Sequence, residues 1–266
     1  IEEISHPVVR ALYEIFEVES SINLSTMADL PGSSGLGSSS SFTVGLIKLL
    51  AHWTSKKLSA REVVDLAVHV ERDVLREAGG VQDQLHATHG GINFFEFEAG
   101  SWRRNDLSNN AFAQTLFSDY IILAYTNKLR SAAGVQKTLV SGVQDRANIN
   151  DLKELAQIAR EVAGLIQGSL SDYDKFGEIS LRLNESWKLK RSSNPYASTE
   201  KISELIDLGR SLGAAGAKVL GAGGGGFVGF LVKPHKRTKL EAGLRKKGIV
   251  CISIRPSLAA CDVINV

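Results

Sequence analysis

The chain of 266 residues is 43% hydrophobic and 23% charged, an ordinary globular composition with room for one large domain or two smaller ones. Its net charge of +2 includes no long basic run, and no apolar run reaches the roughly 18 residues of a membrane span, so neither nucleic acid nor a membrane is an expected partner. Cys251 and Cys261 are the only cysteines, too few for a disulfide framework, so a reducing cytoplasm is the expected compartment.

Hydrophobic periodicity and turn signals predict helices and strands in an irregular order. Ser59-x-x-Glu62 is a capping box that opens one of the helices, and Gly79-Gly80 is expected to end it. The predicted elements are, in chain order, helix 6–16, strand 21–25, helix 42–53, helix 59–76, strands 93–97 and 118–125, helices 152–169, 176–190 and 199–212, strands 217–220 and 227–232, helix 236–246 and strand 249–254.

This order of elements indicates an α+β fold without regular βαβ repeats. We expect two domains, 1–111 and 112–266, with a soft boundary near Ala111. No internal repeat and no long low-complexity linker separates them in the sequence.

A turn rich in glycine and serine leads straight into helix 42–53. The first N–H groups of a helix lack partners within it, and the helix dipole adds partial positive charge there, so this turn predicts an anion site. Gly35 and Gly37 allow the backbone to approach phosphate oxygens, and the hydroxyls of Ser38–Ser41 can bind phosphate or Mg²⁺. A flexible linker or an ordinary helix cap is the alternative. The turn is not a Walker A loop, because it lacks Gly-Lys-Ser/Thr.

A second glycine-rich segment, 221–226, lies between two predicted strands. It matches Gly-x-Gly-x-x-Gly, but the dinucleotide fingerprint needs these glycines to open a helix, whereas strand 227–232 follows them. Two interpretations remain. The segment is either a hairpin with positive φ angles or a backbone that must pass close to a ligand.

Both glycine-rich segments resemble motifs of one family. Pro31-x-x-x-Gly35-Leu36-Gly37-Ser38-Ser39-Ser40 resembles the second motif of the GHMP kinases (galactokinase, homoserine kinase, mevalonate kinase, phosphomevalonate kinase), and 218–226 resembles the third. The resemblance implies ATP and Mg²⁺ as cofactors, with Ser39, or else Ser38, reaching the Mg²⁺. The residues that it assigns to the ATP phosphates are Gly35, Leu36, Gly37, Ser38, Ser39, Ser40, Gly223, Gly224 and Gly225.

Two carboxylates are candidates for the chemistry. Phosphoryl transfer to an alcohol needs charge neutralisation on the γ-phosphate and usually a carboxylate that accepts the hydroxyl proton. Glu71 lies late on helix 59–76 and Asp83 just past its expected end, although each alone is typical of an ordinary surface acid. Their flanking segments are similar to those of galactokinase-like and mevalonate-kinase-like enzymes. The resemblance implies that Glu71 binds Mg²⁺, that Asp83 is the catalytic base or orients the hydroxyl, and that Gln82 and Gln84 face the substrate.

Four segments are most similar to the sugar-phosphate branch of the family, which contains D-glycero-D-manno-heptose 7-phosphate kinase and fucokinase-like enzymes: 80–84, 87–94, 126–132 and 185–191. The resemblance implies a sugar kinase that phosphorylates the anomeric hydroxyl of that heptose phosphate. L-fucose or another hexose is the alternative substrate. A non-catalytic GHMP-fold sensor of sugar and ATP is the alternative of another class, and an enzyme of the same fold that decarboxylates a diphosphate is disfavoured by these segments.

A substrate that already carries a phosphate needs cations to bind it. Arg130 is the candidate for this role. Lys188, Lys190 and Arg191 are further candidates, and a solvated helix face explains these cations equally well.

The resemblance also implies the domain folds. The N-terminal domain would be like domain 2 of ribosomal protein S5, and the C-terminal domain would be ferredoxin-like. The first motif of the family, a Pro-x-Arg-x-x-x-x-Gly-Gly-Gly-type strand and loop that helps bind sugar, is not found in this sequence. Because Ile1 is not an initiator residue, we expect the native polypeptide to extend upstream.

Overall fold

A computed structural model describes residues 3–30, 32, 34–77, 79–98, 100–127 and 149–264. By their internal contacts these residues form two compact units. The first unit consists of Ile1–Ser33, Gly37–Gly91 and Ser257–Val266, and the second consists of Ser34–Leu36 and Ile92–Pro256. The serine-rich turn is therefore divided between the units.

Four α-helices make up most of the described part of the first unit. They are α1 (Pro7–Ile15), α2 (Ser38–Trp53), α3 (Ala60–His69), which continues as a π-helical turn (Val70–Val74), and α4 (Gln82–His89). The predicted helices 6–16, 42–53 and 59–76 are confirmed, although α2 begins earlier than expected. The sequence does not predict α4, because its eight residues are too few to give a clear apolar period.

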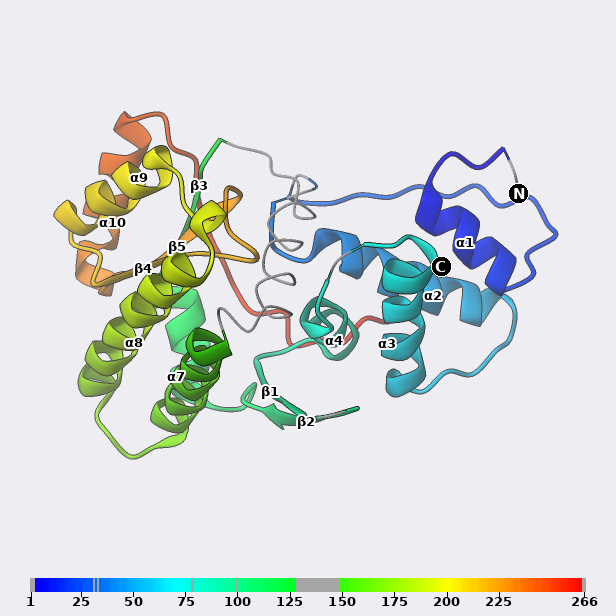
Figure 1. Cartoon of the computed structure of the whole chain (residues 1–266), viewed down its shortest axis with the longest axis horizontal. Helices are drawn as coiled ribbons and strands as arrows, with labels where there is room; N and C mark the ends of the chain where they lie inside the picture. Colours follow the sequence, from blue (N-terminus) through cyan, green and yellow to red (C-terminus); the bar gives the residue numbers. More distant parts are fainter. Residues whose placement is uncertain are drawn as a thin grey trace. The chain divides into compact units, whose positions relative to one another are not determined.

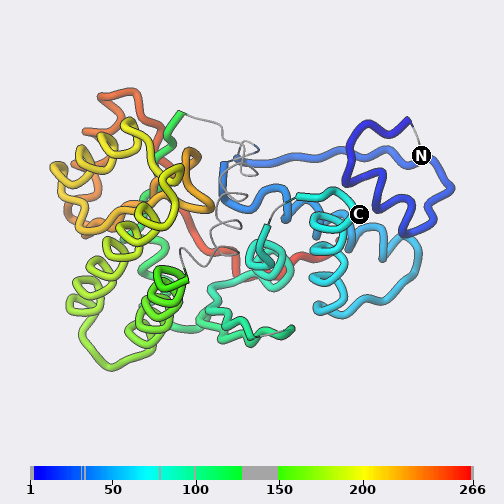
Figure 2. Tube along the Cα trace, viewed as in Figure 1, coloured from blue at the N-terminus to red at the C-terminus, as the bar shows by residue number. Residues whose placement is uncertain are grey.

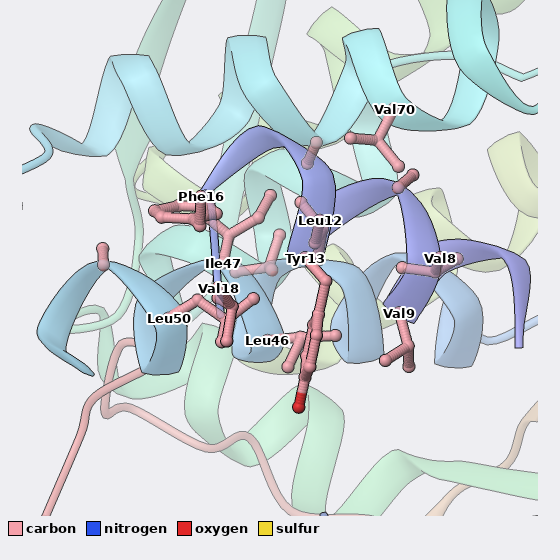
Figure 3. Packing of buried hydrophobic residues seen from close by; sticks show 14 of the residues in the cluster. Val8, Val9, Leu12, Tyr13, Phe16, Val18, Leu46, Ile47, Leu50 and Val70 are labelled. Carbon is pink, nitrogen blue, oxygen red and sulfur yellow. The ribbon is translucent and has the colours of Figure 1, made fainter. Parts of the chain in front are cut away.

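The core of the first unit lies between α1 and α2 (Figure 3). Leu12 of α1 and Phe16, just past its end, pack against Ile47 and Leu50 of α2, and Val70 joins the same cluster from the start of the π-helical turn. Complete burial of such a side chain contributes about 1.5–3 kcal/mol. Packing of these apolar faces therefore orients the helices that carry the candidate site residues.

Helix α3 begins as predicted and ends earlier. The N–H of Ser59 donates to Glu62 Oε2 at 2.7 Å, and the N–H of Glu62 donates to Ser59 Oγ at 3.3 Å, so the capping box is confirmed. The expectation that Gly79-Gly80 ends this helix is wrong. The helical turns end at Val74, and Arg76 then adopts a positive φ of 57°, which prevents a further turn.

Segment 21–25 is not a strand, so that prediction is wrong. Ile22 and Leu24 are half-buried against the core of the first unit and alternate with exposed neighbours, as the pattern predicts. A strand also needs a hydrogen-bonded neighbour. No described segment pairs with this one.

The second unit contains a four-stranded sheet in the order β4-β5-β3-β6, with every neighbouring pair antiparallel. Its strands are β3 (Ile121–Tyr125), β4 (Gly216–Val219), β5 (Phe227–Leu231) and β6 (Cys251–Ser253). The sequence predicts all four. Strand β3 begins later than expected because Leu116–Tyr120 form a π-helical turn.

The helices of the second unit cover both faces of this sheet. Val228 and Phe230 point to one face of the sheet and belong to one hydrophobic cluster. Leu231 points to the other face and belongs to a second cluster. Figure 1 shows α7 and α8 side by side, and the chain doubles back between them in Figure 2. The helices described in this unit are α5 (Ala111–Thr115), α7 (Ile149–Gln167), α8 (Asp172–Ser193), α9 (Glu200–Ser211) and α10 (Pro234–Lys246).

A hairpin of β1 (Asn93–Glu98) and β2 (Ser101–Asp106) also belongs to the second unit. The sequence predicts β1 but not β2, whose residues lack an apolar alternation and are held by their pairing with β1. Ala111 lies inside this unit, because Ile92 and Phe112 share a hydrophobic cluster with α8. The mixture of helices and antiparallel sheets confirms the α+β class. Among the described residues, no helix has both the length and the apolarity to cross a membrane.

Candidate active site

The N-terminus of α2 is the first part of the candidate site. Gly37 precedes the helix with φ of 73°, in the left-handed region that favours glycine. Gly37 stands at the N-cap position and has no side chain that could cap the helix, and Ser38–Ser41 form the first turn. The first N–H groups of a helix lack partners within it, and together with the positive end of the helix dipole they make this helix end suited to an anion.

The two glycine-rich segments contact each other within the second unit. Gly226 has φ of 79°, and a Cβ on it would lie 2.1 Å from the carbonyl oxygen of Ser34. A Cβ on Gly223 would lie 2.7 Å from the Cα of Ala197. Segment 221–226 is thus a hairpin connection between β4 and β5 and also a close backbone approach. Glycine is required at Gly223 and Gly226 because another part of the protein backbone lies close to each of them.

Glu71 is a buried carboxylate in the first unit, with only 7% of its surface exposed. Its Oε2 accepts hydrogen bonds from Ser40 Oγ at 3.1 Å and from Gln84 Nε2 at 2.5 Å. Its Oε1 is buried and has no hydrogen-bond partner among the described residues. The side chain therefore joins the start of α2, the π-helical turn after α3 and the start of α4.

Burial is the main influence on the Glu71 carboxyl group. It raises the pKa of Glu71 above its ordinary value of 4.5, since the charged form loses water. The polar side chains of Thr43, Gln84 and Ser40 lower this pKa in part, and the charge of Glu77 raises it further. The Thr43 hydroxyl itself donates to the carbonyl oxygen of Ser39 at 3.2 Å. A cation beside Oε1 would favour the charged form.

Asp83 is exposed in the first turn of α4 and lies next to the start of α2. Its carboxyl carbon is 3.2 Å from the point that a Cβ on Gly37 would occupy. The structure thus brings Glu71 and Asp83, the two predicted carboxylates, to the same helix N-terminus from different directions. One carboxylate is buried and hydrogen-bonded, and the other is exposed.

The two glutamines beside Asp83 differ in their surroundings. Gln82 is exposed, as a residue that faces a substrate would be. Gln84 is only 3% exposed and its amide nitrogen donates to Glu71, so its side chain points into the protein and not toward a substrate. The reason is helical geometry, because consecutive residues of α4 point about 100° apart.

The serines at the start of α2 differ in the same way. Ser39, which is predicted to reach Mg²⁺, is exposed, whereas Ser40 is 6% exposed and donates to Glu71. The sequence does not reveal the contacts of Ser40 and Gln84 with Glu71. A prediction of α4 as a helix would have placed Gln84 and Asp83 on different faces.

The predicted phosphate-binding cations are separated in the chain. Arg130 lies outside the described residues. Lys190 donates to the carbonyl oxygen of Gly221, which ties α8 to the glycine run. Lys188 lines a shallow groove of α7 and α8 together with Glu154, Glu161 and Glu185. Lys188 and Lys190 therefore have protein neighbours of their own.

Glu71 is the residue of the first unit whose surroundings fit a bound magnesium ion. The described residues contain no group of three or more His, Cys, Asp or Glu side chains that could hold a metal. Mg²⁺ in nucleotide sites usually binds through one or two carboxylates and the substrate phosphates, so such a group is not required. The unpartnered Oε1 of Glu71 fits a cation, because a buried carboxylate oxygen without a partner is costly.

Two family models match the chain. The model of the GHMP kinases N terminal domain matches residues 5–91, and the model of the GHMP kinases C terminal domain matches residues 147–250. The two matches follow the order of the predicted motifs.

Several curated relatives are kinases. The chain is 33% identical to D-glycero-alpha-D-manno-heptose 7-phosphate kinase of Campylobacter jejuni, over 85% of this chain and 66% of that enzyme. It is 27% identical to the bifunctional fucokinase/GDP-fucose pyrophosphorylase of Arabidopsis thaliana, over 87% of this chain and 22% of that protein. It is also 27% identical to mevalonate kinase of Methanocaldococcus jannaschii, over 91% of this chain and 72% of that enzyme. The chain thus spans less than two thirds of the length of the first two relatives.

A solved structure shares the fold. The crystal structure of a D-glycero-D-manno-heptose 1-phosphate kinase from Bacteroides thetaiotaomicron matches with a TM-score of 0.68 and 24% identity, over 94% of this chain and 70% of that chain. This match confirms the predicted two-domain fold. The two family models together match more than half of the chain and establish that it belongs to the GHMP kinase family.

Proposed function

We propose that this protein is an ATP-dependent sugar kinase that phosphorylates the anomeric hydroxyl of D-glycero-D-manno-heptose 7-phosphate. The observation that carries the proposal is the arrangement at the start of α2. The N-terminus of α2, preceded by Gly37, lies beside the exposed carboxylate of Asp83 and the buried carboxylate of Glu71. The 33% identity to a heptose 7-phosphate kinase supports the choice of sugar.

The proposed chemistry uses Asp83 as the base. Asp83 accepts the proton of the acceptor hydroxyl while that oxygen forms a bond to the γ-phosphorus of ATP. The bond from this phosphorus to the oxygen that bridges to the β-phosphate breaks, and ADP leaves with the electron pair. The exposure of Asp83 in the first turn of α4 supports this role.

The serine-rich turn and the glycine run bind the phosphates in this proposal. Backbone N–H groups of 35–40 and of 223–225 donate to phosphate oxygens. Mg²⁺ supplies charge neutralisation on the transferred phosphoryl group, and Glu71 would hold it with Ser39 or Ser38. The buried Oε1 of Glu71 supports the metal role.

Contacts to the sugar are proposed for Gln82 and Arg130. The exposure of Gln82 supports its role. Gln84 is not a substrate contact in this proposal, because it is buried against Glu71. A reducing cytoplasm stays part of the proposal, and it is supported by the free thiols of Cys251 and Cys261.

The proposal is tested by ADP release from the native protein with several acceptors at matched concentrations. The acceptors are D-glycero-D-manno-heptose 7-phosphate, mannose 6-phosphate, L-fucose, galactose and mevalonate. A charge-assisted contact to the substrate phosphate contributes about 1.5–3 kcal/mol. Two such contacts would favour the heptose phosphate over a neutral sugar by roughly 10²–10⁴ in kcat/KM.

Each other outcome selects a different function. Faster turnover of L-fucose would assign a fucokinase, the candidate favoured by similarity to the Arabidopsis protein. Turnover of mevalonate alone would assign the mevalonate branch. ATP binding without ADP release for any acceptor would support the non-catalytic sensor.

A further inference from the structure

The two oxygens of the Glu71 carboxylate have different surroundings. Oε2 accepts from Ser40 at 3.1 Å and from Gln84 at 2.5 Å. Oε1 is equally buried but accepts from no described residue. A carboxylate has about four acceptor positions, so both donors on one oxygen leave the other oxygen available.

The donors come from separate elements and fix the carboxylate in space. Ser40 is on the first turn of α2 and Gln84 is on the first turn of α4. The Gln84 amide has only one end that can donate to a carboxylate, so its orientation follows from the contact. Its own Oε1 is buried and has no partner among the described residues, which is a cost that the contact to Glu71 must offset.

The backbone at Glu71 is also unusual. Helix α3 changes at Val70 into the π-helical turn 70–74, which contains Glu71. π-helical turns are rare and occur frequently at functional sites, because they re-aim a side chain from the regular helix face. This observation is independent of the hydrogen bonds.

We propose that Ser40 and Gln84 are positioning residues that hold Oε2 of Glu71, so that Oε1 is the oxygen presented to the divalent cation bound with the nucleotide. The inference rests on the proposed function. In this proposal Ser40 and Gln84 do not contact the cation. Each acts through its hydrogen bond to Oε2 of Glu71. The predicted contact of Gln84 with the sugar is thereby replaced by a role in metal binding.

A purely structural role is the alternative. Gln84 is buried, and its loss would destabilise α4 whether or not a cation binds. Thr88 supplies the matched control. It lies one turn further along α4, is 2% exposed, and its hydroxyl has no partner among the described residues.

The experiment measures the dissociation constant of a fluorescent ATP analogue for the native protein, once with Mg²⁺ and once with EDTA. The proteins compared are wild type, Gln84→Met, Ser40→Ala and Thr88→Val, and the melting temperature of each is recorded. The readout is the factor by which Mg²⁺ tightens nucleotide binding. Substituting a residue that orients a metal ligand typically weakens metal binding by about 10- to 100-fold.

We expect Gln84→Met to reduce the Mg²⁺ factor by about tenfold or more and Ser40→Ala to reduce it less. Thr88→Val should leave the Mg²⁺ factor unchanged. If both Gln84→Met and Ser40→Ala keep the wild-type Mg²⁺ factor, the positioning role is overturned while the proposed function stands. If Gln84→Met does not fold, the Mg²⁺ factor of Ser40→Ala alone tests the positioning role. If Mg²⁺ does not tighten nucleotide binding to the wild-type protein, both the positioning role and the proposed function are overturned.

Discussion

The carboxyl carbon of Asp83 lies 3.2 Å from the point that a Cβ on Gly37 would occupy. These residues are far apart in the sequence, yet the start of α4 meets the start of α2 at this contact. Gly37 also has a φ of 73°. Two independent constraints, the backbone conformation and the space beside Asp83, therefore favour glycine here.

Gly37→Ala should reduce turnover strongly, because the added methyl group strains the left-handed backbone and presses on Asp83. A left-handed conformation costs a non-glycine residue about 1–2 kcal/mol. The matched control is Gly45→Ala on the same helix, where a Cβ meets nothing within 4 Å. The control should keep its activity and gain up to about 1 kcal/mol in stability. Steady-state kinetics and urea denaturation measure both effects, and equal kcat values for the two variants would contradict the assignment.

Asp83→Asn should abolish phosphoryl transfer and leave nucleotide binding nearly intact. The amide keeps the shape of the side chain but cannot accept the hydroxyl proton, and general-base catalysis contributes about 10²–10⁴ in rate. Asp65→Asn is the control, because Asp65 is an exposed carboxylate of α3 that pairs with Arg61. Single-turnover kinetics measure the loss. More than a tenth of the wild-type rate in Asp83→Asn would show that another group accepts the proton.

Gly226→Ala should destabilise the second unit and weaken nucleotide binding. A Cβ at this position would lie 2.1 Å from the carbonyl oxygen of Ser34, so the serine-rich turn must move. Gly248→Ala controls for backbone strain, because Gly248 has a similar φ of 74° and nothing within 4 Å of its Cβ position. Urea denaturation should give a clearly larger loss for Gly226→Ala than for Gly248→Ala. Equal losses of stability in the two variants would mean that the positive φ alone, and not the contact with Ser34, explains the glycine at position 226.

The metal-free stability of Glu71→Gln should differ from that of wild type in a pH-dependent way. Burial raises the pKa of Glu71 in the folded protein, so the folded state binds this proton more tightly than the unfolded state. The resulting stability is fully present below the unfolded value of about 4.5 and is lost as pH rises through the folded pKa. Glu71→Gln cannot lose a proton, so its melting temperature should exceed that of wild type increasingly above this pH.

Glu62→Gln provides a comparison in which stability should depend on pH in the opposite direction. Hydrogen bonds from Ser59 lower the pKa of Glu62, so its contribution is present above the unfolded value and is lost as pH falls. Melting temperatures in EDTA from acid to neutral pH test both variants. If wild type and Glu71→Gln show the same pH dependence, Glu71 is not a buried charge in the folded protein.

Local interactions explain the predictions that succeeded. The capping box at Ser59 needs only Glu62, three residues on, and the end of the chain from α9 to β6 follows from short apolar periods. Two predictions failed because a strand also needs a hydrogen-bonded partner. Segment 21–25 has a strand pattern without a described partner, and β2 is a strand only because β1 pairs with it.

The sequence by itself determined the family, helices α2 and α3, and the glycine and serine types that an anion site needs. Only the tertiary structure decided that Gln84 and Ser40 meet Glu71 and that Gly226 lies against Ser34. The physical reason is that a motif is read from neighbours along the chain, whereas a buried hydrogen bond depends on how whole helices pack. The apolar faces of α1 and α2 select that packing, and the polar atoms of the candidate site take the partners that the packing brings to them.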